Sequence, residues 1–425
     1  MFYQPLIVFQ ITILFSFLIS TTGHTQPLKA ESPQEIPIYF HKQTQSYTIG
    51  DLQTEFPKDY ISARSRFTDY GARLVSKYNG ATKILTAALP SHPHLSIDGL
   101  YIQGQDPSRL FIITSGIHGA EAFTGSTLQD LFIKYLLKQN SLPFSVLILH
   151  GLNPYGFHHF RRVNPYNVDL NRNHVTPEES ASENPFYDLL SPLLMPESPA
   201  SMGILPQIGF YLGVAIKYLR HGKRTLLNSL SGQYKEPKGL FFGGTHLQHE
   251  SVIVQNWIKE YSEDKTHIVH IDIHTGFGKK GELHFYGSDE FTSSDQLKAL
   301  KLIFPHATID TGASADFYPT HGDFIDWTWK SQAAKIVVPM VFEFGTLDSH
   351  TLKGGLRSLW TLALENQGYH HGYVSRSDYR RIRRQMEALF NPQEKAWQKK
   401  VLESGHKEIV NAYQKLKHLN SPDQK

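Results

Sequence analysis

The chain contains no cysteine among its 425 residues. This absence excludes disulfide bonds, thiolate metal sites and thiol nucleophiles. A metal ion would therefore have to be held by nitrogen and oxygen donors. No single sign of charge dominates either, since 42 basic residues stand against 39 acidic ones. A balanced charge gives no electrostatic footprint for nucleic acid, and we expect no nucleic-acid partner.

Several catalytic signatures are also missing. The sequence has no Gly-x-Ser-x-Gly turn, no phosphate-binding glycine-rich loop and no His-Glu-x-x-His helix motif. The Asp-Thr-Gly tripeptide of aspartic proteases occurs at Asp310, but it has no second copy. These absences argue against serine hydrolases, nucleotide-binding enzymes and aspartic proteases.

Basic residues are missing from the first five positions, before an apolar run from Leu6 to Ser20. This run is shorter than the about 20 residues that a membrane-spanning helix needs. A small residue, Gly23, follows it, and the pattern is otherwise typical of a signal peptide. We expect residues 1–23 to be a cleaved leader of an exported protein, periplasmic or secreted, with no stable membrane span after cleavage. An uncleaved N-terminal membrane anchor and a buried helix are the alternatives.

Apolar runs alternate with helical patterns along the middle of the chain. Strands are predicted at residues 100–104, 110–115, 145–150, 267–273 and 335–343, and helices at 62–78, 124–137 and 352–367. This alternation favours an α/β fold with a mixed, mainly parallel sheet and helices on both faces. We expect a leading segment at 24–61, the main domain at 62–368 with an insertion at about 185–247, and a C-terminal helical extension at 369–425.

A histidine and a carboxylate directly follow the predicted strand at 110–115. His118 and Glu121 are three residues apart on a strand-to-helix loop, so both can turn toward one point. His274 ends another such strand, and Asp272 beside it is either a carboxylate that orients this histidine or an ordinary buried acid. Two histidines and one glutamate, with one position left open, form the ligand set of a catalytic zinc ion. We therefore expect His118, Glu121 and His274 to bind Zn²⁺.

Arginines and amides gather in a second cluster, between Asn153 and Asn173. Arg161, Arg162 and Arg172 bring three guanidinium groups into this short stretch. Arginine binds carboxylates through two hydrogen bonds and can stabilise a developing oxyanion. The cluster predicts an anion site, with a salt-bridged loop as the alternative.

Taken in order, these motifs resemble those of the zinc carboxypeptidases of the carboxypeptidase A type. That family has His-x-x-Glu, Asn-Pro-x-Gly, an arginine with Asp-Leu-Asn-Arg-Asn, a distant histidine, a tyrosine, and a glutamate after phenylalanine. The matching positions are His118/Glu121, Asn153-Pro-Tyr-Gly156, Arg162, Asp169-Leu-Asn-Arg-Asn173, His274, Tyr318 and Phe342-Glu343. The resemblance covers about residues 62–368, and it is closer still to a bacterial subgroup known only as a domain of unknown function.

The resemblance implies roles for the residues around the metal. The three predicted ligands would hold zinc, which lowers the pKa of its water and polarises the scissile carbonyl. Glu343 would take the proton of that water as general base and pass it to the leaving amine. Arg162 would stabilise the oxyanion, and Tyr318 would close over the substrate.

The resemblance also implies how a substrate would bind. Asn171 and Arg172 would hold its terminal carboxylate, and Ile325 would form the base of the side-chain pocket. The implied function is hydrolysis of a C-terminal amide (peptide) bond in a peptide or an acyl-amino acid. A zinc-dependent deacylase or amidase on small N-acyl amino compounds is one alternative, and a non-catalytic binding protein on the same fold is another.

Overall fold

A computed structural model describes residues 46–176, 178, 184–287, 294–310, 320–332 and 335–419. The predicted leader, the first part of the leading segment and Tyr318 lie outside the described residues. Among the described helices, none combines the length and the apolar character that a membrane crossing requires.

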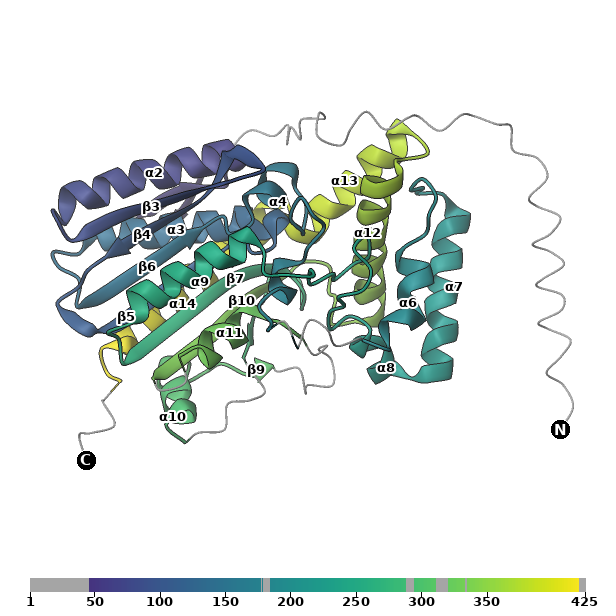
Figure 1. Ribbon diagram of the computed structural model, residues 1–425. Coiled ribbons are helices and arrows are strands. Elements are labelled where there is room, and N and C mark those ends of the chain that lie inside the picture. Colours follow the sequence, from purple (N-terminus) through teal and green to yellow (C-terminus); the bar gives the residue numbers. More distant parts are fainter. Residues whose placement is uncertain are drawn as a thin grey trace, which may run out of the picture.

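An eight-stranded sheet runs through the middle of the molecule, in the order β3-β4-β6-β5-β7-β10-β8-β9 (Figure 1). The strands are β3 (Thr82–Leu89), β4 (His92–Ile102), β5 (Asp106–Ser115), β6 (Phe144–His150), β7 (His267–Gly276), β8 (Leu283–Tyr286), β9 (Ile309–Asp310) and β10 (Ile336–Gly345). The four neighbours β6, β5, β7 and β10 are parallel, whereas β4 and β8 pair antiparallel with β6 and β10. A separate hairpin of β1 (Ser46–Ile49) and β2 (Leu52–Glu55) precedes the sheet. The predicted α/β fold with a mixed, mainly parallel sheet is confirmed.

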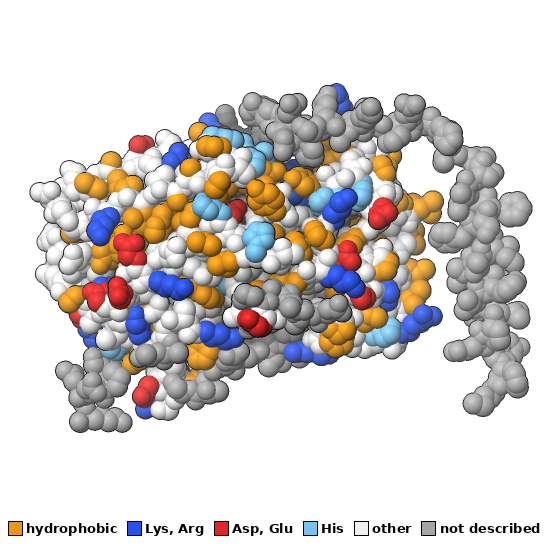
Figure 2. All heavy atoms as spheres, viewed as in Figure 1, with side chains coloured by type: hydrophobic (Ala, Val, Ile, Leu, Met, Phe, Trp, Pro, Cys, Tyr) orange, Lys and Arg blue, Asp and Glu red, His pale blue; other side chains and the backbone are white. Residues whose placement is uncertain are grey.

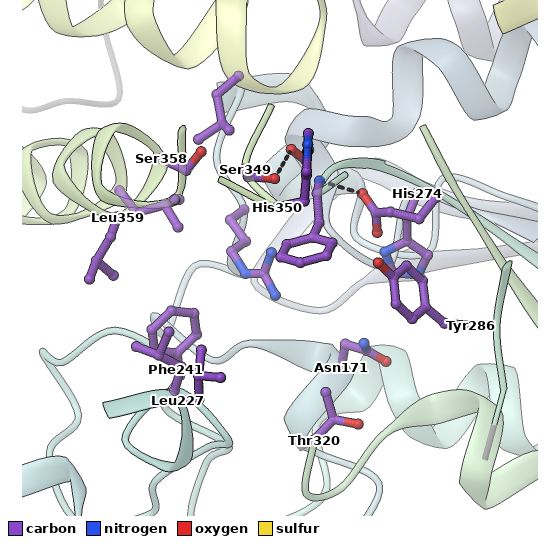
Figure 3. Close-up of a pocket in the computed structure, with 18 of the residues that line it drawn as sticks. Asn171, Leu227, Phe241, His274, Tyr286, Thr320, Ser349, His350, Ser358 and Leu359 are labelled. Carbon is purple, nitrogen blue, oxygen red and sulfur yellow. Dashed lines mark hydrogen bonds between the residues drawn. The ribbon is translucent and has the colours of Figure 1, made fainter. Parts of the chain in front are cut away.

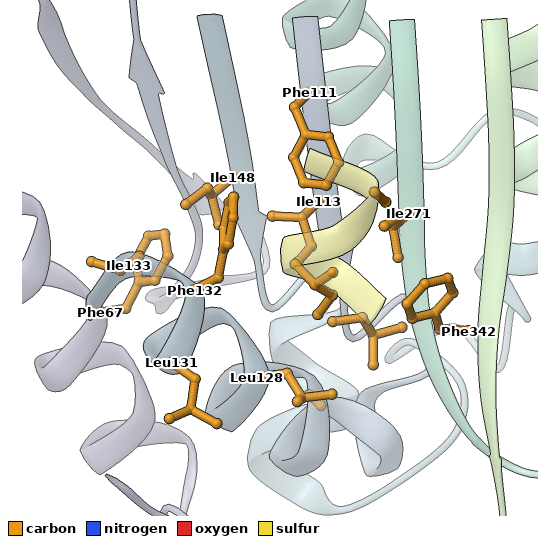
Figure 4. Packing of buried hydrophobic residues seen from close by; sticks show 14 of the residues in the cluster. Phe67, Phe111, Ile113, Leu128, Leu131, Phe132, Ile133, Ile148, Ile271 and Phe342 are labelled. Carbon is orange, nitrogen blue, oxygen red and sulfur yellow. The ribbon is translucent and has the colours of Figure 1, made fainter. Parts of the chain in front are cut away.

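The parallel strands are covered on both faces, which explains why consecutive residues along them are buried. In β5, Phe111 and Ile113 belong to one core, and Leu110 and Ile112 belong to the other. The helices α2 (Tyr60–Lys77), α3 (Ala122–Lys138), α10 (Ser294–Ile303) and α14 (Lys395–Leu416) contribute to the first core, and α9 (His249–Ser262) and α11 (Phe324–Lys330) to the second. Figure 4 shows the first core, where Phe111 and Ile113 face side chains of α3.

A further group of helices stands beside the sheet (Figure 1). Residues 185–247 contain α6 (Tyr187–Leu194), α7 (Ile204–His221) and α8 (Lys223–Asn228), and the later chain adds α12 (Leu352–His371) and α13 (Arg376–Phe390). Leu190, Val214 and Leu226 pack with Trp360 and Leu364 in a third core that these helices share. The segment from 185 to 247 is thus held mainly against α12.

Candidate functional site

The loop after β5 is pressed against α4 (Pro154–His159) and the residues that follow it. A Cβ at Gly119 would lie 2.0 Å from the carbonyl carbon of Gly156, so only glycine fits this approach. The amide of Ala120 donates to the carbonyl oxygen of Arg161 at 2.8 Å. Between these contacts the chain forms a short 3₁₀ helix, η1 (Gly119–Glu121), that leads into α3. His118 and Glu121 are both buried on this turn.

His274 and Glu343 come to the same place from the ends of two other parallel strands. His274 lies near the carboxyl end of β7, and Glu343 lies near the carboxyl end of β10. The two residues are register partners in the parallel pair. Parallel strands share one carboxyl edge, and ligands of α/β proteins bind at that edge. The sheet therefore assembles the predicted site from three separate parts of the chain.

The three predicted metal ligands converge. Nδ1 of His118 lies 2.9 Å from Oε1 of Glu121, and Nδ1 of His274 lies 3.1 Å from Oε2 of the same carboxylate. The ligand atoms of these residues all lie within 4.8 Å of one another, and the two imidazole centroids are 5.0 Å apart. All three side chains are buried. Together they form a site that could hold a metal ion.

Two aspartates orient the imidazoles. Nε2 of His118 lies 3.1 Å from Oδ1 of Asp169, and Nε2 of His274 lies 2.7 Å from Oδ2 of Asp272. An ionised aspartate can only accept in these pairs, so each Nε2 carries a hydrogen, and each Nδ1 is the nitrogen that faces Glu121. Burial works to lower the pKa of His274, but Asp272 and Glu121 outweigh it and raise that pKa well above its usual value. A metal ion bound at Nδ1 would take the place of a proton there. Carboxylates that fix histidines in this way are typical of metal centres.

The chemistry of these donors fits a divalent cation. Nδ1 of His118 is buried and makes no hydrogen bond, although it lies close to a carboxylate oxygen. Burial works to raise the pKa of Glu121, but His118 and His274 outweigh it and hold that pKa below its usual value. Two imidazole nitrogens and an ionised carboxylate, all buried and converging, are the nitrogen and oxygen donors that zinc accepts.

Glu343 stands beside these donors in a different environment. Its Oε1 accepts a hydrogen bond from the amide of Phe277 at 2.9 Å. Burial, and then the negative charge of Glu121, raise the pKa of Glu343 to about 8. Neighbouring carboxyl groups with such different proton affinities are suited to different roles, one as a fixed anion and the other as a proton acceptor.

The adjacent arginines of the second cluster point to different places. Arg162 donates from Nε to Oδ2 of Asp169 at 3.0 Å and lies 3.5 Å from Oε1 of Glu121, so it stands at the metal ligands. Arg161 instead donates to Glu365 on α12 at 2.8 Å and stacks on the ring of Tyr369. The three arginines of the predicted anion cluster are therefore not all at one site. Arg162 and Arg172 line a cavity next to the metal ligands, whereas Arg161 does not.

Asn171, Arg172 and Ile325 all line this cavity. Arg172 is buried and donates from Nη1 to the carbonyl oxygen of Asn171 at 2.8 Å. The amide of Asn171 accepts from the backbone nitrogen of Phe324 and donates to Asp323, which caps α11. Asn171 thus fixes the start of the helix that carries Ile325, and its position links the two predicted substrate-binding elements.

The cavity has a volume of about 680 Å³ and extends from the metal ligands to α7, α8 and α12. This size lies within the range of sites for small organic ligands, roughly 300–1,000 Å³. Figure 3 shows His274 and Tyr286 at one end, and Leu227, Phe241 and Leu359 at the other.

Sequence reasoning left some of these residues without a role. Asp169 belongs to the Asp-Leu-Asn-Arg-Asn motif, but its contact with His118 depends on how η2 (Leu170–Arg172) folds back. Tyr286, Phe277 and His350 also line the cavity, and no pattern in the sequence singles them out. Phe277 and His350 lie in the loops that follow β7 and β10, and Tyr286 ends β8.

Comparisons with solved structures find similar folds among metallo-carboxypeptidases. Bovine thrombin-activatable fibrinolysis inhibitor, in complex with tick carboxypeptidase inhibitor, is 13% identical, with a TM-score of 0.41 over 72% of this chain and 94% of that one. Carboxypeptidase A from Helicoverpa armigera is 15% identical, with a TM-score of 0.41 over 77% and 73%. A metallo-carboxypeptidase from Pseudomonas aeruginosa is 11% identical, with a TM-score of 0.40 over 77% and 76%. These TM-scores are too low to support a conclusion about activity.

The sequence comparisons are more decisive about the family. No curated protein matches the chain. Residues 56–404, however, match a family model described as "Protein of unknown function (DUF2817)". This match confirms the predicted closeness to a group known only as a domain of unknown function. Because it spans most of the sequence, the chain belongs to the DUF2817 family.

Proposed function

We propose that the protein is a zinc-dependent hydrolase that cleaves an amide bond close to a free carboxylate. The observation that carries this proposal is the convergence of both Nδ1 atoms on Glu121, with the Nε2 atoms tied to aspartates. His118, Glu121 and His274 would hold the zinc ion. When bound, zinc would lower the pKa of water and polarise a carbonyl group.

The chain's own groups supply the remaining steps. Glu343 accepts a proton from the attacking water and returns it to the leaving nitrogen, which its raised pKa favours. Arg162 donates hydrogen bonds to the oxygen that gains negative charge at the carbonyl carbon. Its contacts with Asp169 and Glu121 hold the guanidinium in place before a substrate arrives.

We assign the substrate's free carboxylate to Arg172 and Asn171, which follow Arg162 in the sequence. Arg172 offers a fork of donors that matches a carboxylate, and Asn171 would add a donor from its amide. Ile325 would contact the side chain next to the carboxylate, which argues against a basic side chain there. Tyr318 keeps its proposed role as the group that closes over the substrate.

A second function uses the same metal and base. The apolar part of the cavity favours a deacylase that acts on N-acyl amino compounds over a general carboxypeptidase. The test is a metal assay combined with digestion of a peptide library and of N-acyl amino acids, with products identified by mass. Release of C-terminal amino acids from peptides supports a peptidase. Cleavage of the N-acyl amino acids alone, into acyl acid and amino acid, supports a deacylase. Stoichiometric zinc without cleavage of any amide would contradict both and indicate a binding protein.

A further inference from the structure

The cavity has two chemically different ends. The end at the sheet carries the proposed metal ligands together with Arg162 and Glu343. The other end is walled by aliphatic and aromatic side chains of residues 185–247 and of α12. They are Leu190, Val214, Ala215, Leu219, Leu226, Leu227, Leu230, Phe241, Leu352, Leu356, Leu359 and Leu362. Figure 3 shows Leu227, Phe241 and Leu359 around the space at this end.

The apolar end of the cavity offers few hydrogen-bonding groups to a peptide. Among the described lining residues on α6, α7, α8 and α12, only Tyr218, Lys223 and Ser358 have polar side chains. A peptide backbone carries one donor and one acceptor for nearly every residue, and leaving these unpaired in an apolar site is costly. A hydrocarbon chain has no such groups and gains free energy from every methylene that leaves water. The wall therefore discriminates in favour of hydrocarbon.

The outer face of α7 extends the apolar surface beyond the cavity. Ile204, Ile208, Leu212 and Ile216 are exposed along this helix, and Leu219, which is 83% exposed, also lines the cavity. Figure 2 shows hydrophobic side chains along the edge of the molecule where α7 lies. A contiguous row of exposed apolar side chains on one helix face is typical of a binding surface.

Positively charged residues lie at one end of this exposed face of α7. Residues 204–228 contain no Asp or Glu, whereas Lys217, Arg220, Lys223 and Arg224 gather at the end of α7 and the start of α8. An apolar helix face with basic residues at one end fits a lipid surface with anionic headgroups. Leu219 then connects that surface with the interior of the cavity.

We propose that the substrate is an amide that carries both a free carboxylate and a long unbranched hydrocarbon chain, such as an N-acyl amino acid. The chain lies between α7, α8 and α12. This inference rests on the proposed function for the position of the scissile bond. The reaction is hydrolysis: the oxygen of water bonds to the acyl carbon, the carbon–nitrogen bond breaks, and a proton from water passes through Glu343 to the nitrogen. The products are a fatty acid and a free amino acid.

The test measures kcat/KM of the full chain, loaded with zinc, for N-acyl-L-leucines from acetyl to dodecanoyl. We expect kcat/KM to rise roughly fourfold per added methylene until the chain fills the apolar end. Ala215→Trp, which narrows that end from α7, should lower the dodecanoyl-to-acetyl ratio at least tenfold. Ala88→Trp is the matched control, because it makes the same change at an exposed alanine on β3. A ratio that is flat in the wild type, or equal in both variants, overturns the inference.

A binding measurement distinguishes a failure of this inference from a failure of the proposed function. Titration calorimetry with Glu343→Gln should show tighter binding of N-dodecanoyl-L-leucine than of N-acetyl-L-leucine. If this preference holds and the wild type hydrolyses neither compound, the hydrocarbon site stands and the hydrolase assignment fails. If both compounds are hydrolysed with equal kcat/KM and bind equally, the hydrolase stands and the hydrocarbon site fails. Faster cleavage of tetra-alanyl-leucine than of dodecanoyl-leucine would also contradict the hydrocarbon site.

A vesicle experiment identifies where the substrate resides. The wild type and Leu219→Asp are sedimented with phosphatidylcholine vesicles that contain or lack phosphatidylglycerol. Binding of the wild type to the anionic vesicles, weakened in the variant, supports delivery from a lipid surface. If the wild type does not sediment with the anionic vesicles, delivery of the substrate from a lipid surface is overturned. The preference for long acyl groups then applies to acyl-amino acids dissolved in water.

Discussion

Glu343 and His274 are direct partners across the parallel pair of β10 and β7. The proposed general base is therefore fixed to the proposed metal site by backbone hydrogen bonds of the sheet rather than by a flexible loop. A position set by paired strands changes little when the side chain is altered. Substitution of Glu343 should consequently test chemistry without disturbing the metal.

We expect Glu343→Gln to keep one zinc ion per chain and to lose activity. The amide has nearly the same shape as the carboxyl group but cannot accept a proton, so kcat should fall at least about a hundredfold. Metal analysis and steady-state kinetics on the best substrate check this prediction. Glu282→Gln, at a half-exposed glutamate on the surface, serves as the control. Undiminished turnover in Glu343→Gln would remove the assigned base.

Asp272→Asn should weaken zinc binding roughly tenfold to a hundredfold. The aspartate accepts the Nε2 hydrogen of His274 at 2.7 Å, and an asparagine holds the imidazole less firmly and adds no negative charge. Competition with a zinc chelator measures the change. Asp326→Asn, which makes the same change at another aspartate of the cavity wall, provides a comparison. Equal zinc affinity in Asp272→Asn and the wild type would show that this carboxylate does not act on the metal.

Replacement of Arg172 should distinguish substrates by their carboxylate. Charge-assisted hydrogen bonds contribute about 1.5–3 kcal/mol, so Arg172→Ala should raise KM about tenfold to a hundredfold for substrates with a free carboxylate. Amidated analogues should be much less affected. Because Arg172 is buried, Arg172→Lys supplies a second variant that keeps the positive charge but loses the fork of donors. An equal change in KM for acids and amides would withdraw the carboxylate-binding role.

Acid should destabilise the protein through His150, which is buried between α2 and α3 and stacks on Phe67. Burial lowers the pKa of His150 to about 4, from an ordinary value of 6.5. Between these two values the unfolded chain binds a proton that the folded chain does not, so stability falls as the pH drops from 6.5 toward 4. The loss reaches about 3 kcal/mol.

Urea unfolding from pH 7 to pH 4.5 measures this loss. His150→Gln should show a shallower dependence of the unfolding free energy on pH than the wild type. His249→Gln, at an exposed histidine on α9, should keep the wild-type slope. Identical slopes in all three proteins would mean that His150 does not titrate in this range.

The sequence predicted the parts of the fold that are buried on both sides. The runs at 110–115, 145–150 and 267–273 are rich in apolar residues and buried throughout, and the structure confirms strands there. The antiparallel strands are less visible, because β3 alternates between exposed and partly buried residues and β8 has only four residues. The place of the candidate site was predicted by the same reasoning, because polar residues that follow parallel strands meet at one edge of the sheet.

Side-chain direction was beyond the reach of sequence reasoning. Arg161 and Arg162 are adjacent and chemically identical, yet one contacts Glu365 and the other contacts Asp169. Nothing local distinguishes them, because the choice depends on where α12 packs. The apolar end of the cavity was hidden for a similar reason. Its lining comes from residues 185–247 and α12, which meet only in the folded chain.

Because Arg161 and Arg162 point in opposite directions, these two adjacent residues connect α12 with the proposed metal ligands. Arg161 fastens its segment to α12 through Glu365 and Tyr369, and Arg162 fastens the next residue to Asp169 and Glu121. A single peptide unit therefore joins α12, which lines the apolar end of the cavity, to the proposed oxyanion donor. We expect an occupant wide enough to displace α12 to displace that donor as well, and so to alter its position at the reacting bond.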